Sequence, residues 1–227
     1  MKIEVWSDFT CPYCYIGKRR LDKAIEKFGK QNEIEVEYKS FELGTAASPD
    51  IQASIQTTGM EQQKMHQEKN DDIISAAHRL GIPLQLNNLA HTNTFDAHRL
   101  VKYARKHNKE HDIVERLFET YLVHHHNIEE RTVLLTVATE AGLDETEIEE
   151  LLCLNKFGKN VKLDEELASD IGVTKVPFYI FDEIHAISGL LTIDSFLEVL
   201  RELWQKGRED KQTKPTAYCT DTGCHIE

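Results

Sequence analysis

Apolar and polar residues alternate in two early segments of the chain, with a helical pattern between them. Residues 2–7 and 33–43 follow the two-residue period of a half-buried strand. Between them, apolar residues recur at positions 21, 24, 25 and 28, which is the spacing of an amphipathic helix. This helix is expected to begin at Pro12 and to end near Asn32. Strand, helix and strand in this order predict a βαβ unit with parallel pairing.

The pattern is helical from residue 44 to residue 171, and no segment there has the period of a strand. Polar residues with capping spacing mark where several of these helices begin, and the last helix is expected near residues 159–171. The expected N-terminal caps are Asn93, Asn127 with Glu130, and Asp144 with Glu147.

Strand patterns return in residues 176–181 and 185–189, separated by a three-residue turn typical of a hairpin. Thr192 is expected to cap a helix whose apolar stripe ends at Trp204, after which the chain becomes polar. The order of elements predicts an α/β domain formed by residues 1–44 and 172–206. Residues 45–171 form an inserted helical domain, and residues 207–227 a polar tail.

Composition narrows the classes of partner. The net charge of −12 argues against nucleic acid, whose binding needs clustered Lys and Arg. No apolar run approaches the roughly 18 residues of a membrane span. The first residues have the pattern of a strand and not of a secretory leader, so we expect a cytoplasmic protein. The sequence leaves the oligomeric state open.

The segment "SDFTCPYCYIGKRR" places two cysteines where a strand gives way to a helix. Cys11 falls at the expected N-terminus of the helix, where free N–H groups and the helix dipole stabilise a thiolate. Cys14 lies one turn further in and is more shielded. This arrangement predicts an attacking and a resolving thiol. The alternative is half of a zinc site, completed by Cys219, Cys224 and His225.

Several other residues have competing interpretations. Cys153 is expected to be a buried core thiol, and the three consecutive histidines at 124–126 do not share a helix face, so we expect no metal site there. Either Asn93 caps a helix that carries Asp96 and Arg99 on its surface, or Asn93, Phe95 or His98 lines the cleft over Cys11. For the Val176–Pro177 bond, base rates alone favour the trans form.

The polar tail contains Cys219 and Cys224, separated by four residues. These cysteines are either incidental thiols at a dispensable end or a second redox pair. In the second interpretation they exchange with Cys11 and Cys14, since a flexible linker of about 15 residues after Trp204 spans about 20 Å.

The segments "KIEVWSDFTCPYCYIGKRRL", "NTFDAHRL" and "IGVTKVPFYIF" together resemble the thioredoxin superfamily, in its DsbA-like branch, and most closely the FrnE-like oxidoreductases. The resemblance implies a thioredoxin-like fold, βαβ plus ββα, with a large α-helical insertion. It implies that Cys11 is the nucleophile and Cys14 the resolving thiol. It also implies a cis Val176–Pro177 bond packed against the thiols. Pro12, Tyr13, Val176 and Pro177 would then form the substrate-binding side.

The function expected from this resemblance is thiol–disulfide exchange or isomerisation. It needs no cofactor beyond the redox-active disulfide. The expected partners are protein disulfides or dithiols and a thiol reductant system, with glutathione as one reductant. Two alternatives stay open. One is a glutathione-dependent transferase or isomerase of small molecules, although related enzymes resembling hydroxychromene-carboxylate isomerases have serine at the position of Cys11. The other is a redox-regulated, chaperone-like binding module.

Overall fold

The computed structural model describes residues 1–43, 70–87, 89, 91–213, 217–220 and 223–226, and from residue 208 onward it describes the backbone alone. Within these residues, no helix is long and apolar enough to cross a membrane.

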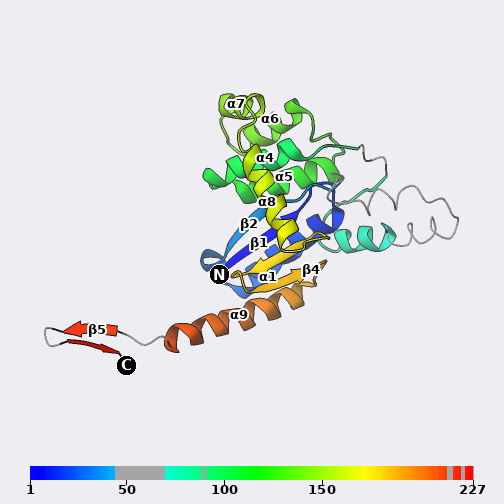
Figure 1. The fold of residues 1–227 in the computed structure, drawn as a ribbon. Helices are drawn as coiled ribbons and strands as arrows, with labels where there is room; N and C mark the ends of the chain where they lie inside the picture. The colour runs from blue at the N-terminus through cyan, green and yellow to red at the C-terminus, as the bar shows by residue number, and fades with distance from the viewer. Residues whose placement is uncertain (44–69, 88, 90, 214–216, 221–222, 227) are drawn as a thin grey trace.

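A four-stranded sheet with the strand order β2-β1-β3-β4 forms the centre of the fold (Figure 1). β1 (Lys2–Ser7) pairs in parallel with β2 (Glu35–Ser40), as the sequence predicts. β1 also pairs antiparallel with β3 (Phe178–Phe181), which forms a hairpin with β4 (His185–Ser188). Residues far apart in sequence therefore meet at β1, and the loop that follows β1 leads into the helix start where the thiol pair lies.

The two faces of the sheet bury different side chains because strand residues alternate in direction. Ile3 and Val5 face the larger core, which includes α1 (Pro12–Phe28) and α9 (Ile193–Thr213). Trp6 points to the other face, where its indole nitrogen donates to the Asp164 carbonyl at 3.2 Å. Asp164 belongs to α8 (Gly158–Asp170), so α8 covers this second face.

The described part of the inserted region contains helices and no strand, beginning with a helix at residues 70–78 and an irregular segment before residue 95. The helices α4 to α7 gather at one side of the sheet, and α8 runs from them across it (Figure 1). Their bounds are α4 Phe95–Lys106, α5 Glu110–Leu122, α6 Arg131–Glu140 and α7 Glu145–Cys153. Residues 45–69 of the predicted insertion lie outside the described residues.

The predicted ends of the helices are confirmed in part. Pro12 is the first residue of α1, and the side chain of Asp144 accepts a hydrogen bond from Glu147 N as a cap of α7. The Thr192 hydroxyl likewise accepts from Ser195 N at 3.1 Å at the start of α9. The prediction that α1 ends at Asn32 is wrong. The helix ends at Gly29, whose φ of 76° is in the left-handed region that glycine adopts without strain.

Two predicted asparagine caps are corrected by the structure. The residue before α6 is Glu130, and Asn127 instead forms a turn in which its Oδ1 accepts from Glu129 N at 3.1 Å. The residue before α4 is Thr94, while Asn93 Oδ1 accepts from Phe95 N at 2.9 Å. Both asparagines bond the backbone two residues ahead, a local turn that competes with capping.

The predicted polar linker after Trp204 is wrong in its first part, because α9 continues to Thr213. Two short strands follow, β5 (Ala217–Thr220) and β6 (Gly223–Ile226), which pair antiparallel with Cys219 opposite Cys224. The side chains of both cysteines lie outside the described residues.

A buried group of charged residues joins α1 to α5. The Lys18 side chain is only 1% exposed, and its ammonium group lies 2.6 Å from Glu115 Oε2 and 2.9 Å from Asp22 Oδ2. Glu115 Oε1 also accepts from the Tyr15 hydroxyl and from Arg19, each at 2.7 Å. Burial opposes ionisation of Glu115, but Lys18 and these donors hold its pKa below the ordinary value. This group fixes the helix that carries the thiols against the inserted helices.

Candidate functional site

The loop between β1 and α1 is anchored by a buried carboxyl group. Asp8 has no exposed surface, and its carboxylate accepts hydrogen bonds from Thr10 N, at 3.2 Å, and from Leu43 N beyond the end of β2. The Asp8 carbonyl in turn accepts from Cys11 N at 3.1 Å. These bonds hold the chain in one conformation as it enters α1, and so they position Cys11.

Cys11 is the residue immediately before α1, in an extended conformation with φ −92° and ψ 108°. No side chain caps this helix, so the thiol stands where the free N–H groups and the positive end of the dipole are. Cys11 is 6% exposed, and its sulfur lies 4.0 Å from the Val176 carbonyl oxygen. The helix start predicted from the sequence is confirmed.

Cys14 lies one turn further along α1 and is 2% exposed. Burial raises its pKa well above the ordinary value, and the hydrogen bond with the Cys11 side chain adds to the effect. Both cysteines are free thiols in this structure. One thiol at the helix start and one more deeply buried, proton-retaining thiol behind it are the two parts that dithiol exchange requires.

The two residues between the cysteines have different surroundings. Pro12 occupies the first position of α1, where its missing N–H leaves no bond unmade. Tyr13 is 42% exposed and lies at the rim of the site. Its pKa is raised by partial burial and by the proximity of Cys11. An exposed aromatic ring beside the reactive thiol is a surface that a substrate chain can contact.

The Val176–Pro177 peptide bond is cis, as the resemblance implies and contrary to the base rate for such bonds. The Pro177 carbonyl accepts from Gly189 N at 2.8 Å, which ties this loop to the end of β4. Pro177 also reaches α1, since a Cβ atom at Gly17 would lie 3.2 Å from Pro177 Cγ. The loop therefore packs against the helix that carries both thiols.

A hollow of about 200 Å³ lies between the end of β2 and the loop that leads to Val176. Glu42 lines it, and burial together with a bond to Glu165 raises the Glu42 pKa to about 7. The Lys162 ammonium lies 3.3 Å from Glu42 and 2.8 Å from Glu165. At neutral pH Glu42 is therefore partly protonated, and Lys162 offsets the remaining charge of Glu42 and Glu165 at this wall of the hollow.

Three residues predicted either to line the cleft or to stabilise a helix have recorded partners other than the thiols. His98 is 3% exposed, stacks on Phe9 with ring centroids 4.8 Å apart, and keeps a neutral ring because burial lowers its pKa to about 3. Phe95 lines a separate hollow beside Lys162, and Asn93 bonds the backbone of Phe95. Within the described residues no recorded contact joins these three residues to either cysteine, and the cleft role stays a prediction.

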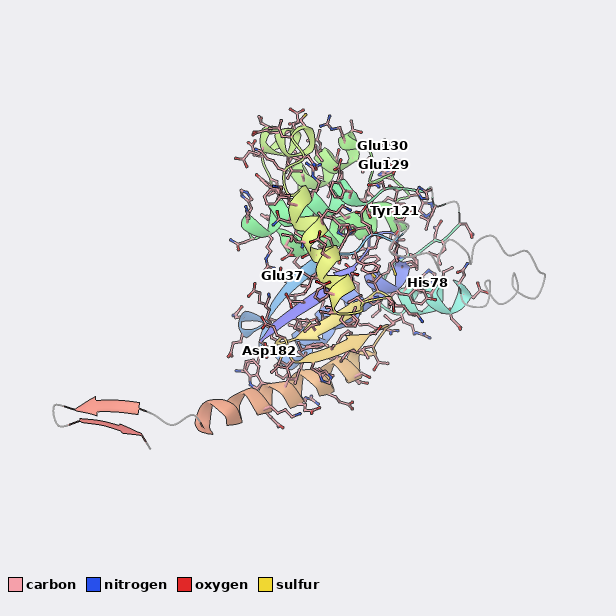
Figure 2. The ribbon with its side chains drawn as sticks, viewed as in Figure 1. Glu37, His78, Tyr121, Glu129, Glu130 and Asp182 are labelled. Carbon is pink, nitrogen blue, oxygen red and sulfur yellow. The ribbon has the colours of Figure 1, made fainter. Side chains whose placement is uncertain are left out.

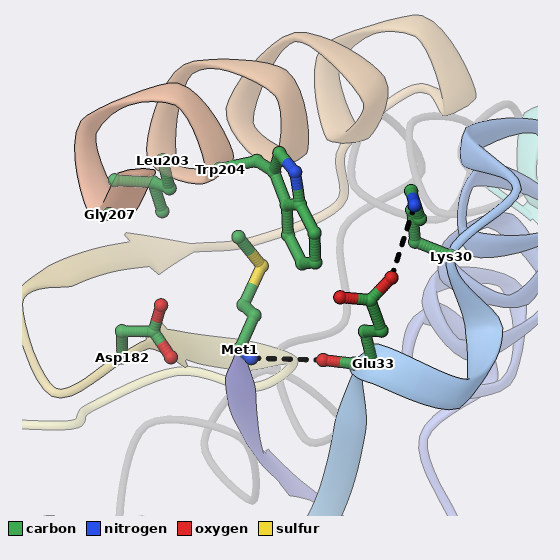
Figure 3. A pocket seen from close by; sticks show the side chains of 7 residues that line it. All are labelled: Met1, Lys30, Glu33, Asp182, Leu203, Trp204 and Gly207. Atoms are coloured by element: carbon green, nitrogen blue, oxygen red, sulfur yellow. Dashed lines mark hydrogen bonds and ion pairs between the residues drawn. The ribbon is translucent and has the colours of Figure 1, made fainter. Parts of the chain in front are cut away.

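The largest of the described cavities, about 700 Å³, lies at the other end of the sheet (Figure 3). Met1, Trp204 and Asp182 line it. Met1 precedes β1 whereas Cys11 follows the opposite end of that strand, so this cavity is remote from the thiols. Figure 2 likewise shows Asp182 at the turn of the β3–β4 hairpin, away from the helical insertion.

The prediction for Cys153 is wrong, and the predictions about metal binding can be compared with the described side chains. Cys153, predicted to be a core thiol, is exposed at the end of α7 and accepts a bond from Arg131 at 3.0 Å. The helix places its last residue outside the apolar face formed by Ile148, Leu151 and Leu152. In the part of the chain that the structure describes, no three His, Cys, Asp or Glu side chains could together hold a metal ion. The side chains of the alternative zinc ligands in the tail lie outside it.

Three residues of the site were not found by sequence reasoning: Asp8, Gly17 and Tyr179. Asp8 appears only as a polar residue before the thiol pair, and nothing in the pattern shows that it is buried. The Tyr179 hydroxyl would lie 2.2 Å from a Cβ atom at Gly17, a contact between a strand and a helix that are 162 positions apart in the chain. The presence of glycine in an otherwise helical pattern was the one available signal.

Asp8 gives the protein a stability that depends on pH. Burial raises its pKa to about 6 against the hydrogen bonds it accepts. The folded state therefore favours the protonated carboxyl, and its stability falls as pH rises from about 4, the unfolded value, through about 6. The loss from this group is about 3 kcal/mol at about 1.4 kcal/mol per unit of pKa. Urea unfolding of the reduced wild type and of Asp8→Asn, from pH 4.5 to 7.5, measures it.

The difference in the free energy of unfolding between the wild type and Asp8→Asn is expected to change across this pH range. The other titrating groups are the same in both proteins, so their contributions cancel in this difference. Asp8→Asn loses one acceptor for a backbone N–H, and it should be less stable than the wild type at the acid end. A constant difference at every pH would contradict the assignment of the titration to Asp8.

Comparison with known families decides the relationship: residues 2–201 match the DsbA-like thioredoxin domain. The chain belongs to this family. The uncharacterized protein YwbO of Bacillus subtilis is 32% identical over 143 residues, which cover 63% of this chain and 66% of YwbO. The alignment thus spans just under two thirds of the length of that relative.

Solved structures agree with this DsbA-like fold. A probable DsbA oxidoreductase, SCO1869 of Streptomyces coelicolor, superposes with a TM-score of 0.80 at 26% identity, covering 100% of this chain and 99% of its own. A 2-hydroxychromene-2-carboxylate isomerase gives 0.71 at 17% identity, covering 93% and 98%. The cytosolic disulfide reductase DsbM of Pseudomonas aeruginosa gives 0.62 at 15% identity, covering 90% and 99%, and has also been solved with GSH. The last two similarities concern the fold alone.

Proposed function

We propose that this DsbA-like protein is a thiol–disulfide oxidoreductase with Cys11 as nucleophile and Cys14 as resolving thiol. The observation that carries the proposal is the placement of Cys11 at the uncapped start of α1, with buried Cys14 one turn behind it. The positive end of the helix dipole lies at the first position, and burial keeps the proton on Cys14 at the second.

In the reducing direction, the Cys11 thiolate attacks one sulfur of a substrate disulfide. A bond forms between Cys11 and that sulfur while the substrate S–S bond breaks, and the other substrate sulfur leaves as a thiolate. Cys14 then loses its proton and attacks the Cys11 sulfur, which releases the second substrate sulfur. Two electrons pass from the enzyme dithiol to the substrate, and the oxidised enzyme runs the same steps in reverse.

The substrate is proposed to be a protein disulfide or dithiol in an extended segment. Val176 and Pro177 form a loop beside Cys11, whose sulfur lies 4.0 Å from the Val176 carbonyl. Backbone groups at such a loop can pair with a chain in the manner of an added strand. Tyr13 offers an exposed ring at the same rim. Pro12, Tyr13, Val176 and Pro177 together form the proposed binding side.

The proposal includes a thiol reductant system, with glutathione as one reductant, and no further cofactor. It also includes a cytoplasmic location and membership of the FrnE-like branch. The cytosolic reductase of the same fold has been solved with GSH, which supports glutathione as the reductant to test first. Cysteine at position 11 favours dithiol exchange over the transferase and isomerase chemistry of related enzymes, which resemble this chain but have serine there.

Insulin reduction tests the proposal, with glutathione and, separately, thioredoxin with its reductase as electron donors. Turnover with either donor that depends on both cysteines supports it. Conversion of a small-molecule substrate by glutathione without disulfide reduction would favour the transferase or isomerase alternative. Protection of an unfolded protein from aggregation, with no disulfide turnover, would favour the chaperone-like alternative.

We propose a disulfide between Cys219 and Cys224 as a second redox pair. The two residues are direct partners in the β5–β6 ladder. Such partners have Cα atoms about 4.5–5.5 Å apart, within the range of about 4.4–6.8 Å that a disulfide spans. Non-reducing peptide mapping of the oxidised protein is expected to yield a linked Cys219–Cys224 peptide, and its absence from fully oxidised protein would contradict the pairing.

The helical extension of α9 limits how this pair can exchange with Cys11. Trp204 packs against Phe28, with ring centroids 5.6 Å apart, at the end of α1 away from Cys11. α1 is about 25 Å long, and α9 continues from Trp204 to Thr213, about 13 Å further. The six residue steps from Thr213 to Cys219 span at most about 20 Å. Exchange is therefore expected between two molecules, at a rate that rises with protein concentration and disappears in Cys219→Ser/Cys224→Ser.

A further inference from the structure

The hydroxyl group of Tyr179 has an unusual environment for a buried polar atom. Tyr179 has no exposed surface, and within the described residues its Oη has no hydrogen-bond partner. Its ring packs edge-on against Phe196 of α9, with centroids 5.1 Å apart, which fixes the direction of the side chain. Burial of a hydroxyl without a partner costs roughly 1–3 kcal/mol, so such a group calls for an explanation.

The hydroxyl points at the helix that carries the thiols. Tyr179 follows Pro177 by two positions, and its Oη is the nearest atom to the Cβ position of Gly17, at 2.2 Å. Gly17 lies three residues after Cys14 in α1 and therefore on the same helix face. Any larger residue at position 17 would displace the hydroxyl, so glycine there leaves room for it beside Cys14.

The largest effects of charge on Tyr179 come from the two thiols of this helix. Its pKa is raised well above the ordinary value by burial and then by the charges of Cys14 and Cys11. The phenol is therefore neutral across the physiological pH range, and it can donate its proton in a hydrogen bond to an anion beside it. The anions that the proposed reaction creates in this space are the two cysteine thiolates.

We propose that the Tyr179 hydroxyl donates a hydrogen bond to the Cys14 thiolate in the step that resolves the mixed disulfide. This inference rests on the proposed function. The unpaired donor gains its acceptor only when Cys14 ionises, so the bond lowers the energy of the resolving step and leaves the first attack by Cys11 unaffected. Tyr179 keeps its own proton throughout.

The resolving step conserves atoms and electrons for any disulfide substrate. Cys14 gives its proton to water, and its sulfur then attacks the sulfur of Cys11. The Cys11–Cys14 bond forms, the bond from Cys11 to the substrate breaks, and the second substrate sulfur leaves as a thiolate. The enzyme dithiol is oxidised by two electrons, and the substrate disulfide is reduced by two.

The test uses Tyr179→Phe in the full-length chain with Cys153, Cys219 and Cys224 replaced by serine, so that only the two site thiols react. The probe is 5,5′-dithiobis(2-nitrobenzoate), which releases one coloured thiolate when Cys11 attacks and a second when Cys14 resolves. The first phase is expected to keep its rate. The second phase is expected to slow about tenfold, which is the size expected for the loss of a hydrogen bond to a charged group. The pH at which this phase reaches half of its maximum rate is expected to rise by about one unit.

Tyr38→Phe is the matched control. The Tyr38 hydroxyl is also buried without a recorded partner among the described residues, and Tyr38 and Tyr179 lie opposite the same residue, Val5, on either side of β1. Neither cysteine is among the charges that shift the Tyr38 pKa. Removal of this hydroxyl is expected to leave both phases unchanged.

The outcomes separate this inference from the function on which it rests. If the second phase of Tyr179→Phe is unchanged, or if both phases slow equally, the donor role is overturned while dithiol exchange stands. If Cys11→Ser in the same background still releases the first thiolate at the full rate, the proposed function itself fails. Tyr179→Phe should melt no lower than the parent, because it loses only an unpaired hydroxyl. If this variant does not fold, 3-fluorotyrosine is placed at position 179, because its hydroxyl is a stronger hydrogen-bond donor. The second phase must then become faster, and an unchanged rate would overturn the inference.

Discussion

Cys11→Ser is expected to lose disulfide exchange by more than about a thousandfold, the scale on which removal of a nucleophile lowers turnover. Serine keeps the size of the side chain, but its hydroxyl is not ionised at neutral pH and cannot form the mixed disulfide. The fold should be unaffected, since Cys11 contributes no capping bond to α1. Reduction of insulin, followed with excess reductant, measures the loss.

Cys14→Ser gives the complementary result. It should still form the mixed disulfide with a substrate, because Cys11 keeps its place at the helix start, but it cannot release it. Non-reducing electrophoresis is expected to show covalent adducts that accumulate with Cys14→Ser and are absent with Cys11→Ser. Adducts that persist in Cys11→Ser would assign the nucleophile to Cys14. Equal turnover by both single variants would refute dithiol exchange at this pair.

Glu115→Gln is expected to destabilise the protein by about 3 kcal/mol, because it leaves the buried Lys18 ammonium with less than its full set of partners. Lys18 is 1% exposed and lies 2.6 Å from Glu115, while Asp22, its other carboxylate, is itself 26% exposed. The variant also weakens the bonds from Tyr15 and Arg19 to the same carboxylate. Urea unfolding at pH 7 measures the change in the free energy of unfolding.

Two further variants give this prediction its controls. Glu150→Gln removes an exposed ion pair with Lys156, whose side chains are 52% and 43% exposed, and should change stability by no more than about 0.5 kcal/mol. Lys18→Met combined with Glu115→Leu replaces both buried charges with apolar side chains and is expected to recover most of the loss. If Glu115→Gln is as mild as Glu150→Gln, the interface between α1 and α5 does not depend on this group of charges.

The effect on activity should differ from the effect on stability. Lys18 follows Cys14 by four residues, so the charged group lies one turn behind the thiols on α1. Glu115→Gln is therefore expected to lower the unfolding free energy while the folded protein keeps most of its exchange rate. The first phase with the aromatic disulfide probe, measured in the absence of urea, reports the rate of the folded state.

The sequence could predict those parts of the fold that depend on neighbours along the chain. The βαβ unit at residues 2–43, the hairpin near residues 178–188 and the cap of α7 by Asp144 follow from local periodicity and from bonds within three residues. The position of Cys11 at the start of α1 follows in the same way, because Pro12 favours the first turn. Local competition defeated the predictions for Asn93 and Asn127, where asparagine forms turns as readily as caps, and the prediction for Asn32 failed because Gly29 ends the helix first.

Predictions about burial were less secure because burial depends on contacts between distant segments. Cys153 has an apolar neighbourhood in sequence, yet it lies at the exposed end of α7. The polar residues after Trp204 suggest a linker, yet α9 keeps its helix to Thr213. A polar composition does not distinguish an exposed helix from an irregular tail, since both are solvated on all sides.

The sequence by itself determined that two thiols stand at the start of a helix, one ahead of the other, since this needs only a strand, a proline and a helical period. Only the tertiary structure decided what surrounds them. It placed Val176 beside Cys11, buried Asp8 beneath the loop, and directed the Tyr179 hydroxyl at Gly17. Each of these contacts joins segments that meet only because β1 lies between β2 and β3 in the sheet. A pairing of that kind is set by the packing of the whole chain and leaves no periodic mark on either segment.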